Sequence, residues 1–554
     1  MIFMAVIDFE FRKLKEDGLE DLTLEKLEEV LFDFGLEIDA YDKESDILKI
    51  EITAERTDLL SFNGFKRALK AYLLKEDYND FILNKSDLKV YVEKSAIEYG
   101  NYTMCAVIKN LKLNSEKIKE IINVQEKLHL TYGRKRKSVA IGVYPLDKIN
   151  FPIYFKADVP KKINFIPLGE EKQMNALEII NENPTGKEYA HLLEGKSKFL
   201  YFKDSKENIL SMPPIINSSQ TGKVQEDTTD LFIECTGSNL KKLKKMMNIL
   251  SCLFSDFGGE VYSLEIIYPD MVITSPDVLK DKISCSLKSI NKTIGVKFKK
   301  EDVKPLLKKM MIYDVNFLDD DKFEVNAPIY RTDILHENDI ADDIARAYTF
   351  SKINPTFSPV NFSGERLKDS IIQEEVVNSM VSMGFIEVLP FSLSSIKENF
   401  ENFNLKKEKY IPLGFSAESS LNMVGTWILP KLFKSLTNNQ HRSFPQKLFS
   451  CDYIVLENKK SDTLSENKLS LAAVISNSKV SFTEISSYLL SLFNVFGKKL
   501  ILKPKDYPFY IKGRSASVFI DDLEIGHIGE FSIDVLKKHS YFIPVCGFEI
   551  DVVF

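Results

Sequence analysis

Apolar residues recur along this sequence at two different spacings. Between residues 22 and 34, Leu24, Leu27 and Leu31 are spaced for one face of an amphipathic helix, and Gly35 follows as a stop signal. From Leu48 to Thr53, apolar and polar residues alternate, which is typical of a half-buried strand. Further helices are expected at residues 61–74, 115–132 and 365–383, and beginning at 275, 299 and 429, the last continuing to 449. Further strands are expected at 88–92, 102–108, 323–328, 385–393, 513–530 and 548–551.

These helix and strand patterns are mixed along the whole chain rather than segregated into one half. A chain of 554 residues is expected to form several domains. We therefore predict an α+β multidomain fold. We place its modules at residues 1–85, 86–268, 269–355 and 356–554.

Four aspartates are concentrated in the stretch IYRTDILHENDIADDIARAYTF, residues 329–350. Ile340, Ile344 and Tyr348 recur every four residues and predict a helix there. The acids at helical positions i, i+3 and i+4 then share one side. The four aspartates are Asp333, Asp339, Asp342 and Asp343.

Two explanations of this acidic cluster remain open on spacing alone. Clustered carboxylates repel one another unless a cation lies among them, and oxygen ligands of this kind suit Mg²⁺. Alternatively, acids in a first helical turn favour the positive end of the helix dipole. In that case Asp342 and Asp343 could pair with Arg346.

Composition and charge narrow the class of protein. The chain carries 74 Lys and Arg against 81 Asp and Glu, a net charge of -7, whereas a protein that clamps long nucleic acid is more often basic. Any RNA contact is therefore local or shared with a partner. The six cysteines include no CxxC pair, and nowhere do eighteen apolar residues run together. We expect a cytoplasmic protein without disulfides, a zinc site or a membrane span.

Two charged segments have both a structural and a functional interpretation. Arg56 and Asp58 follow a predicted strand and could form a local ion pair at a turn or take part in a subunit contact. The basic loop at residues 133–137, Gly-Arg-Lys-Arg-Lys, could contact an RNA backbone. A solvated run of charges is the more common case for such a loop.

The aspartate-rich stretch has the order Arg331-x-Asp333-Ile334, His336-Glu337-x-Asp339-Ile340, Asp342-Asp343-x-Ala345-x-Ala347-Tyr348. This order resembles the signature of phenylalanyl-tRNA synthetase β subunits of the archaeal and eukaryotic cytosolic type. The resemblance implies that Asp333, Asp339, Asp342 and Asp343 bind Mg²⁺ at the contact with the catalytic α subunit. It also implies that residues 269–355 form a small winged-helix-like module.

A second match lies between residues 183 and 237, which contain NPTGKEYAH, LSMPPIINS and DLFIECTG. This order resembles the family's editing module, of mixed α/β structure, which hydrolyses tyrosine wrongly attached to tRNA(Phe). The implied pocket residues are Ser211, Glu234 and Thr236. Glu234 replaces the Asp of archaeal relatives. From the residues alone, Pro213-Pro214 could simply set a rigid turn, and Thr236-Gly237 could end a strand.

Residues 356–554 resemble the family's catalytic-like module, an antiparallel sheet with helices of the class II synthetase kind that docks the α subunit. It departs from relatives at Gly425-Thr426-Trp427 and at Phe449-Ser-Cys-Asp452. The match to the archaeal and eukaryotic type extends to the end, where no anticodon-binding extension follows Asp551.

The resemblance as a whole predicts a phenylalanine–tRNA ligase β subunit. Such a subunit would form an α₂β₂ tetramer, bind tRNA(Phe), and support ATP-dependent attachment of phenylalanine by the α subunit. The aminoacylation site would lie on the α subunit. A free-standing aminoacyl-tRNA hydrolase and a scaffold without catalytic activity are the alternatives. No P-loop stands in the sequence, so ATP is expected only as a substrate of the complex.

Overall fold

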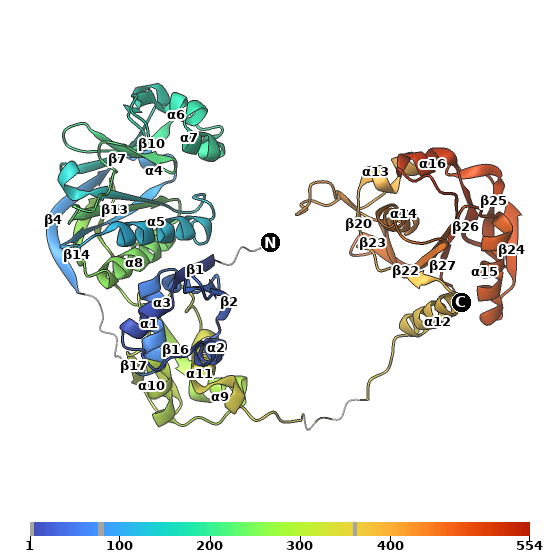
Figure 1. The fold of residues 1–554 in the computed structure, drawn as a ribbon, viewed down its shortest axis with the longest axis horizontal. Helices are drawn as coiled ribbons and strands as arrows, with labels where there is room; N and C mark the ends of the chain where they lie inside the picture. Colours follow the sequence, from blue (N-terminus) through green and yellow to red (C-terminus); the bar gives the residue numbers. More distant parts are fainter. Residues whose placement is uncertain (1–4, 76–81, 358–359, 361–362, 554) are drawn as a thin grey trace. The chain divides into compact units, whose positions relative to one another are not determined.

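A computed structural model describes residues 5–75, 82–357, 360 and 363–553 of the chain. It contains two compact units, Met1–Phe357 and Ser358–Phe554, each with several sheets or cores of its own (Figure 1). The architecture is a mixed α/β multidomain fold, as the sequence patterns predicted. No helix among the described residues is long and apolar enough to cross a membrane.

The first sheet of the N-terminal unit is a small antiparallel one in the order β1-β3-β2. Its strands are β1 (Ala5–Glu10), β2 (Glu37–Asp42) and β3 (Ile47–Ile52), and its helices are α1 (Arg12–Glu16), α2 (Leu24–Phe34) and α3 (Phe62–Tyr72). The predicted amphipathic helix is confirmed as α2, which Thr23 caps at its start. Gly35 ends it in the left-handed region, with φ of 89°, which glycine adopts without strain.

The second sheet of the N-terminal unit has ten strands, in the order β12-β11-β10-β7-β4-β14-β5-β13-β6 with β15 paired to β14. Its strands are β4 (Leu83–Val92), β5 (Tyr102–Lys109), β6 (Ala140–Pro145), β7 (Ile153–Asp158), β10 (Phe199–Lys203), β11 (Ile209–Met212), β12 (Ile216–Asn217), β13 (Leu231–Gly237), β14 (Glu260–Ile267) and β15 (Val272–Ser275). Helix α8 (Leu240–Asp256) packs on β5, β13 and β14, and α5 (Ser115–Leu130) packs on β6. Around this sheet lie α4 (Lys94–Ile97), α6 (Ala176–Glu182), α7 (Pro184–Tyr189) and the pair β8 (Asn164–Phe165) and β9 (Met174–Asn175).

The aspartate-rich segment follows the last strand of a third sheet, which has the antiparallel order β16-β18-β17, and its helix packs on β16. The strands are β16 (Lys282–Ser286), β17 (Val315–Phe317) and β18 (Lys322–Asn326), and the helices are α9 (Leu287–Ile294), α10 (Lys300–Lys309) and α11 (Glu337–Tyr348). The helix expected from Ser275 is wrong. Ser275 instead ends β15 opposite Leu264, and its hydroxyl accepts a hydrogen bond from the backbone N–H of Cys105, so a strand takes the place of a helix N-terminus.

The C-terminal unit is built on a seven-stranded sheet in the order β19-β22-β23-β27-β26-β25-β24, antiparallel except between β19 and β22. Its strands are β19 (Ile386–Glu387), β22 (Gln446–Glu457), β23 (Ser465–Ser476), β24 (Leu500–Pro504), β25 (Tyr510–Ile520), β26 (Leu523–Phe531) and β27 (Val545–Asp551), beside the short pair β20 (Leu393–Ser394) and β21 (Met423–Val424). Its helices are α12 (Lys368–Ser382), α13 (Ile396–Asn399), α14 (Leu429–Asn438), α15 (Phe482–Val495) and α16 (Ile533–Lys538).

Helices cover both faces of this seven-stranded sheet. Ala473 of β23 lies in one core with α12 and α15, whereas its neighbour Val474 lies in a second core with α14 and α16. Successive side chains of a strand point to opposite faces, so the two cores lie on the two sides of the sheet.

Two elements expected in the C-terminal unit are wrong. The helix expected to continue from Asn438 to Phe449 ends at Asn438, and residues from Gln446 onward form β22, because Pro445 cannot continue a helix. The buried strand expected at 385–393 is reduced to Ile386–Glu387 and Leu393–Ser394. Pro390 interrupts the ladder, and Phe391 is 89% exposed.

Candidate functional site

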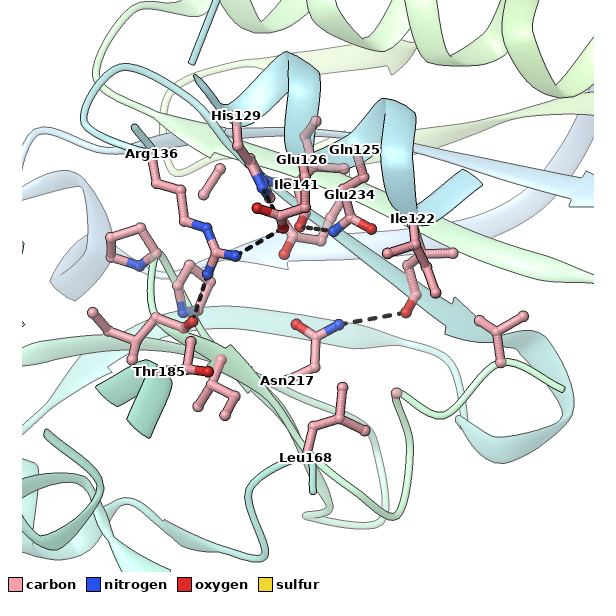
Figure 2. Close-up of a pocket in the computed structure, with 18 of the residues that line it drawn as sticks. Ile122, Gln125, Glu126, His129, Arg136, Ile141, Leu168, Thr185, Asn217 and Glu234 are labelled. Carbon is pink, nitrogen blue, oxygen red and sulfur yellow. Dashed lines mark hydrogen bonds and ion pairs between the residues drawn. The ribbon is translucent and has the colours of Figure 1, made fainter. Parts of the chain in front are cut away.

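A cavity of about 410 Å³ lies between α5, β6, β13 and the segment 213–217 of the N-terminal unit. Most of its wall is apolar, including Ile121, Ile141 and Val143. A smaller polar set is gathered at one side, where Figure 2 shows Glu126, His129 and Arg136 close together. A largely apolar cavity with a few convergent polar groups is typical of a small-molecule binding site.

Glu234 of β13 contributes a second carboxyl group to the wall of this cavity, beside that of Glu126, and its side chain is buried. Burial raises the pKa of Glu234 to about 8, although a hydrogen bond from Tyr144 acts in the opposite direction. The hydroxyl of Tyr144 lies 3.1 Å from Glu234 Oε1 and 2.7 Å from Ser211 Oγ. Glu234 Oε2 is buried without a hydrogen-bond partner among the described residues. Native proteins rarely leave a buried acceptor in this state, so Oε2 is the acceptor of the cavity that is open to a hydrogen bond from a ligand.

Gly142 of β6 makes room for this arrangement. It lies opposite Glu234 in the ladder between β6 and β13. A Cβ atom at position 142 would lie 2.4 Å from both Glu234 Oε1 and the hydroxyl oxygen of Tyr144. Both groups would have to move, so glycine is required here for close approach of the carboxyl and the phenol.

The structure links two of the three predicted pocket residues, Ser211 and Glu234, through the hydroxyl of Tyr144. Ser211 does not line the cavity. It lies behind Tyr144 as the partner of the phenol and is itself buried. Thr236 shares a strand face with Glu234, two residues further along β13, but it lines a second cavity. The roles of Ser211, Glu234 and Thr236 in a reaction remain a prediction.

One ion pair and a set of hydrogen bonds hold the polar side of the cavity. Arg136 donates to Glu126 Oε1 at 3.0 Å and to the backbone carbonyl of Ile215 at 2.8 Å. The guanidinium also stacks 4.2 Å from the ring centroid of Tyr189. Burial lowers the pKa of His129, which lies 3.3 Å from the same carboxylate and accepts a hydrogen bond from the Ile141 N–H. Sequence reasoning missed Glu126, His129 and Tyr144, and only the basic loop that contains Arg136 gave a signal.

The aspartate cluster is helical from Glu337 onward, as predicted, but its carboxylates have separate partners. Arg331 binds both Asp333, at 2.7 Å, and Asp343, at 2.9 Å. Asp339 accepts from the backbone N–H groups of Leu335 and His336 and so caps α11. Asp342 pairs with Arg346 at 2.7 Å.

The triplet Arg-Thr-Asp occurs twice, at 56–58 and 331–333, each time after a strand. In both copies the arginine binds the aspartate two residues later through two of its nitrogens. The copies meet at Thr57 and Thr332, whose hydroxyl oxygens lie 3.2 Å apart. The Arg56–Asp58 pair is therefore a buried internal contact of the N-terminal unit, and the repeated triplet was a signal in the sequence.

Burial and charge act against each other in this network. Burial raises the pKa of Asp343 to about 6, although Arg331 and Arg56 oppose the shift. Burial also acts on Asp333, but there the guanidinium of Arg331 outweighs it and the pKa is lowered. The two carboxylates lower the energy of the buried guanidinium, so the pKa of Arg331 is raised even though burial alone would lower it.

This geometry does not form a ready Mg²⁺ cage. The guanidinium of Arg331 already lies between Asp333 and Asp343, the position that a cation shared by them would need. No group of three or more His, Cys, Asp or Glu in the described part of the chain is placed to hold a metal ion. The Mg²⁺ site at Asp333, Asp339, Asp342 and Asp343 therefore remains a prediction from the sequence.

Comparison with known proteins identifies the family. Residues 4–75 match the model of the Phe-tRNA synthetase beta subunit B1 domain, 283–350 the tRNA synthetase B5 domain, and 353–552 the phenylalanyl tRNA synthetase beta chain CLM domain. The chain is 34% identical over 498 residues to the phenylalanine–tRNA ligase beta subunit of Thermococcus sibiricus, covering 89% of this chain and 88% of that protein. It is 33% identical over 538 residues to that of Pyrococcus furiosus, covering 96% of each.

A solved structure agrees with these matches. It is an N-terminal fragment of the phenylalanyl-tRNA synthetase beta subunit from Pyrococcus horikoshii, with a TM-score of 0.59 and 33% identity. The match covers 62% of this chain and 99% of the fragment. These findings define a subunit of an aminoacyl-tRNA synthetase. The chain belongs to the family of phenylalanine–tRNA ligase β subunits.

Proposed function

We propose that the chain edits misacylated tRNA, hydrolysing the ester of Tyr-tRNA(Phe) in the cavity beside Glu234. The observation that carries this proposal is the unpartnered Glu234 Oε2, an acceptor buried in the wall of a mostly apolar cavity. The apolar walls suit an aromatic ring, and the acceptor suits a hydroxyl at the end of that ring. Tyrosine and phenylalanine differ by this hydroxyl alone.

The protonation state of Glu234 sharpens this discrimination. Because its pKa is raised to about 8, the side chain is mostly a neutral carboxylic acid at pH 7. Protonation of Oε1 would reverse the bond that Tyr144 donates to it, so that Oε1 donates to the phenol and the phenol's own proton goes to the nearer Ser211. Oε2 then remains a carbonyl acceptor for the substrate hydroxyl. Phenylalanine would leave that acceptor unpaired, at a cost of about 1–3 kcal/mol.

Hydrolysis at this site needs no protein nucleophile, because a ribose hydroxyl beside the ester already activates it. The chain contributes by holding the amino acid in one orientation and by placing water against the carbonyl carbon. Thr236 lies two residues from Glu234 on the same strand face. It is therefore the candidate residue for positioning the water near the ester.

Substituting Glu234 in the complex with an α subunit tests the editing proposal. Glu234→Ala should slow deacylation of Tyr-tRNA(Phe) by about tenfold or more, since 1.4 kcal/mol corresponds to a factor of ten. Glu234→Gln keeps a neutral acceptor and should retain more activity than the alanine variant. The readout is release of labelled tyrosine, with phenylalanine attachment measured in parallel and expected to stay near normal.

The matched control for that assay is Glu182→Ala, an exposed acid of the same unit. A wild-type complex that never releases tyrosine would remove the editing proposal, as would full-rate release by Glu234→Ala. Release by the isolated chain at the rate of the complex would instead favour the free-standing hydrolase. The scaffold alternative predicts no release from either.

Membership of the β-subunit family implies an α-subunit partner and tRNA, and we propose an α₂β₂ tetramer in the cytoplasm. Within the complex, ATP and Mg²⁺ serve the attachment reaction, whose site we place on the α subunit. The C-terminal unit offers exposed apolar side chains that suit a protein partner, among them Leu389, Phe391 and Phe415. Obligate interfaces tend to be large and apolar.

The variant Asp339→Asn distinguishes the two proposed roles of Asp339, as a ligand of Mg²⁺ and as a cap of the helix. Asparagine keeps an oxygen that can accept from Leu335 and His336, so capping alone predicts a loss below about 1 kcal/mol that is the same in Mg²⁺ and in EDTA. A metal at the α contact predicts weaker α association only when Mg²⁺ is present. Native mass measurements with and without α distinguish the two, and a chain that ignores α altogether would contradict the tetramer.

A further inference from the structure

Helix α14 of the C-terminal unit begins without a cap from its own segment. The residue before its first turn is Ile428, whose side chain makes no capping hydrogen bond. The carboxyl group of Glu549, on the distant strand β27, takes the place of the cap. Its Oε1 and Oε2 lie 2.8 Å and 3.0 Å from the backbone nitrogen of Ile428, and Oε2 lies 2.9 Å from that of Leu429. A carboxylate at this position also meets the positive end of the helix dipole.

This cap is enclosed between α14 and the seven-stranded sheet. Glu549 is 6% exposed, and Ser470 of β23 donates a hydrogen bond to its Oε1 at 3.3 Å. Burial raises the pKa of Glu549 to about 7, although the backbone N–H groups of Leu429 and Ile428 act in the opposite direction. The cap therefore gains or loses its proton close to neutral pH.

A buried lysine lies beside the same turn. Lys431 is 7% exposed, and in the part of the chain that the structure describes its ammonium makes no ion pair. Gly425 makes room for it, since a Cβ atom there would lie 2.9 Å from Lys431 Cε. Burial lowers the pKa of Lys431, whereas the charges of Asp452 and Glu549 raise it. A cation in a first helical turn is unfavourable, so the nearby carboxylates are its compensating charges.

The other titratable groups beside Glu549 come from neighbouring strands. His527 lies directly opposite it on β26, and burial lowers the pKa of this imidazole to about 4. Burial also raises the pKa of Tyr510, on β25, well above its ordinary value. Neither group changes charge near neutral pH. Asp452 of β22 acts on Lys431. Glu549 and Lys431 are therefore the two titrations to separate experimentally.

The capped turn is continuous with an exposed apolar segment. The Gly425 N–H donates to the Ser392 carbonyl at 2.9 Å, and Val424 of β21 pairs with Leu393 of β20. Two residues before Leu393 lies Phe391, which is among the exposed apolar side chains that suit a protein partner. Backbone contacts thus join the residues before α14 to the strand that follows Phe391.

We propose that Glu549 is a proton-controlled cap of α14, which holds residues 425–429 in place when ionised and releases them when protonated. The carboxylate accepts hydrogen bonds with both oxygens. In the neutral acid one oxygen carries the proton, and the attraction to the helix dipole and to Lys431 is lost. The released turn leaves the segment around Phe391 less ordered, so binding to an α subunit weakens as pH falls. This last step rests on the α-subunit contact proposed for the C-terminal unit.

Trp427 is the only tryptophan of the sequence and reports directly on the capped turn. It precedes Ile428, and its indole N–H donates to the Asn399 carbonyl at 2.8 Å. The full chain is titrated from about pH 5 to 9, and the emission maximum and acrylamide quenching of Trp427 are measured. We expect one transition with its midpoint near pH 7 and stronger quenching on the acid side. Glu549→Gln, which has nearly the same shape and no titrating proton, should lack the transition.

A second variant, Lys431→Met, separates the two titrations. It keeps much of the side-chain volume and removes the ammonium, whose charge lowers the pKa of Glu549. The midpoint of the Trp427 transition should therefore move to higher pH. A transition that persists in Glu549→Gln, or one that vanishes in Lys431→Met, would overturn the proposal.

The matched control is Glu530→Gln, at a buried carboxyl of the same sheet. Glu530 accepts from the Phe482 N–H at the start of α15, but it pairs with Arg514. Its titration curve should match that of the wild type.

Affinity for the α subunit is measured in parallel by native mass spectrometry. It should fall several-fold between about pH 8 and 6 in the wild type and stay constant in Glu549→Gln. A Trp427 transition with α binding that does not depend on pH would overturn the step from the cap to the partner surface. A chain that binds no α subunit at any pH would refute the proposed contact, while the Trp427 transition would still support the cap. The two failures are therefore distinguishable.

Discussion

Replacing Arg331 with methionine is expected to lower the free energy of unfolding of the N-terminal unit by about 3–5 kcal/mol. Arg331 is 1% exposed, and its guanidinium holds two carboxylates, Asp333 and Asp343. Methionine fills much of the same volume but leaves two buried acids that repel each other. Breaking a buried pair by removing one partner costs far more than the pair contributes relative to an apolar replacement.

Urea denaturation of the full chain, followed by hydrogen–deuterium exchange at residues 48–60 and 330–345, would measure this effect in the right unit. Arg346→Met is the matched control, because its partner Asp342 is exposed and such pairs contribute about 1 kcal/mol or less. Adding Asp343→Asn to Arg331→Met should restore part of the loss by removing one uncompensated charge. Equal losses for Arg331→Met and Arg346→Met would show that the network is not stabilising.

The elements that sequence patterns predicted correctly are those whose conformation is determined by residues within the element itself. Helix α2 has an apolar stripe, a capping threonine and a terminal glycine, so its start, face and end are all encoded within thirteen residues. The errors occurred where pairing with a strand distant in the sequence determines the conformation. Ser275 is a residue type that often begins a helix, but it pairs with Leu264 in a sheet. Gln446 follows a helix in the sequence, but it begins a twelve-residue strand.

The candidate site shows the same division. Helical spacing correctly placed Asp339, Asp342 and Asp343 on α11, but their partners could not be read from that spacing. Arg331 reaches Asp343 from twelve residues away, and Tyr144 reaches Glu234 from ninety. Resemblance to a family selected Glu234. Only the fold shows that one of its carboxyl oxygens is bound to a phenol and the other is not.

The stability of the chain should carry a pH dependence that belongs to Glu234. The pKa of Glu234 is about 8 in the folded chain, whereas an unperturbed glutamate has a pKa of 4.5. As pH rises, the unfolded chain therefore loses this proton at a lower pH than the folded chain does. The stability contributed by the protonated carboxyl is complete below pH 4.5 and is lost between about pH 4.5 and 8. The loss is about 1.4 kcal/mol for each pH unit of that window.

Glu234→Gln removes this titration and keeps the shape of the side chain. The variant should match the wild type near pH 4.5 and become more stable than it as pH rises, by on the order of 4 kcal/mol at pH 8. Urea denaturation at half-unit steps from pH 5 to 8.5 measures the difference, in which all other titrating groups cancel.

Glu182→Gln, at an exposed position, should show no such divergence from the wild type. A constant difference between Glu234→Gln and wild type across the range would mean that the carboxyl is solvated, and the neutral acceptor on which tyrosine discrimination depends would be absent. A growing difference would mean that the chain keeps a carboxyl group at a cost to its own stability. Such a cost is expected where a side chain is retained for binding rather than for packing.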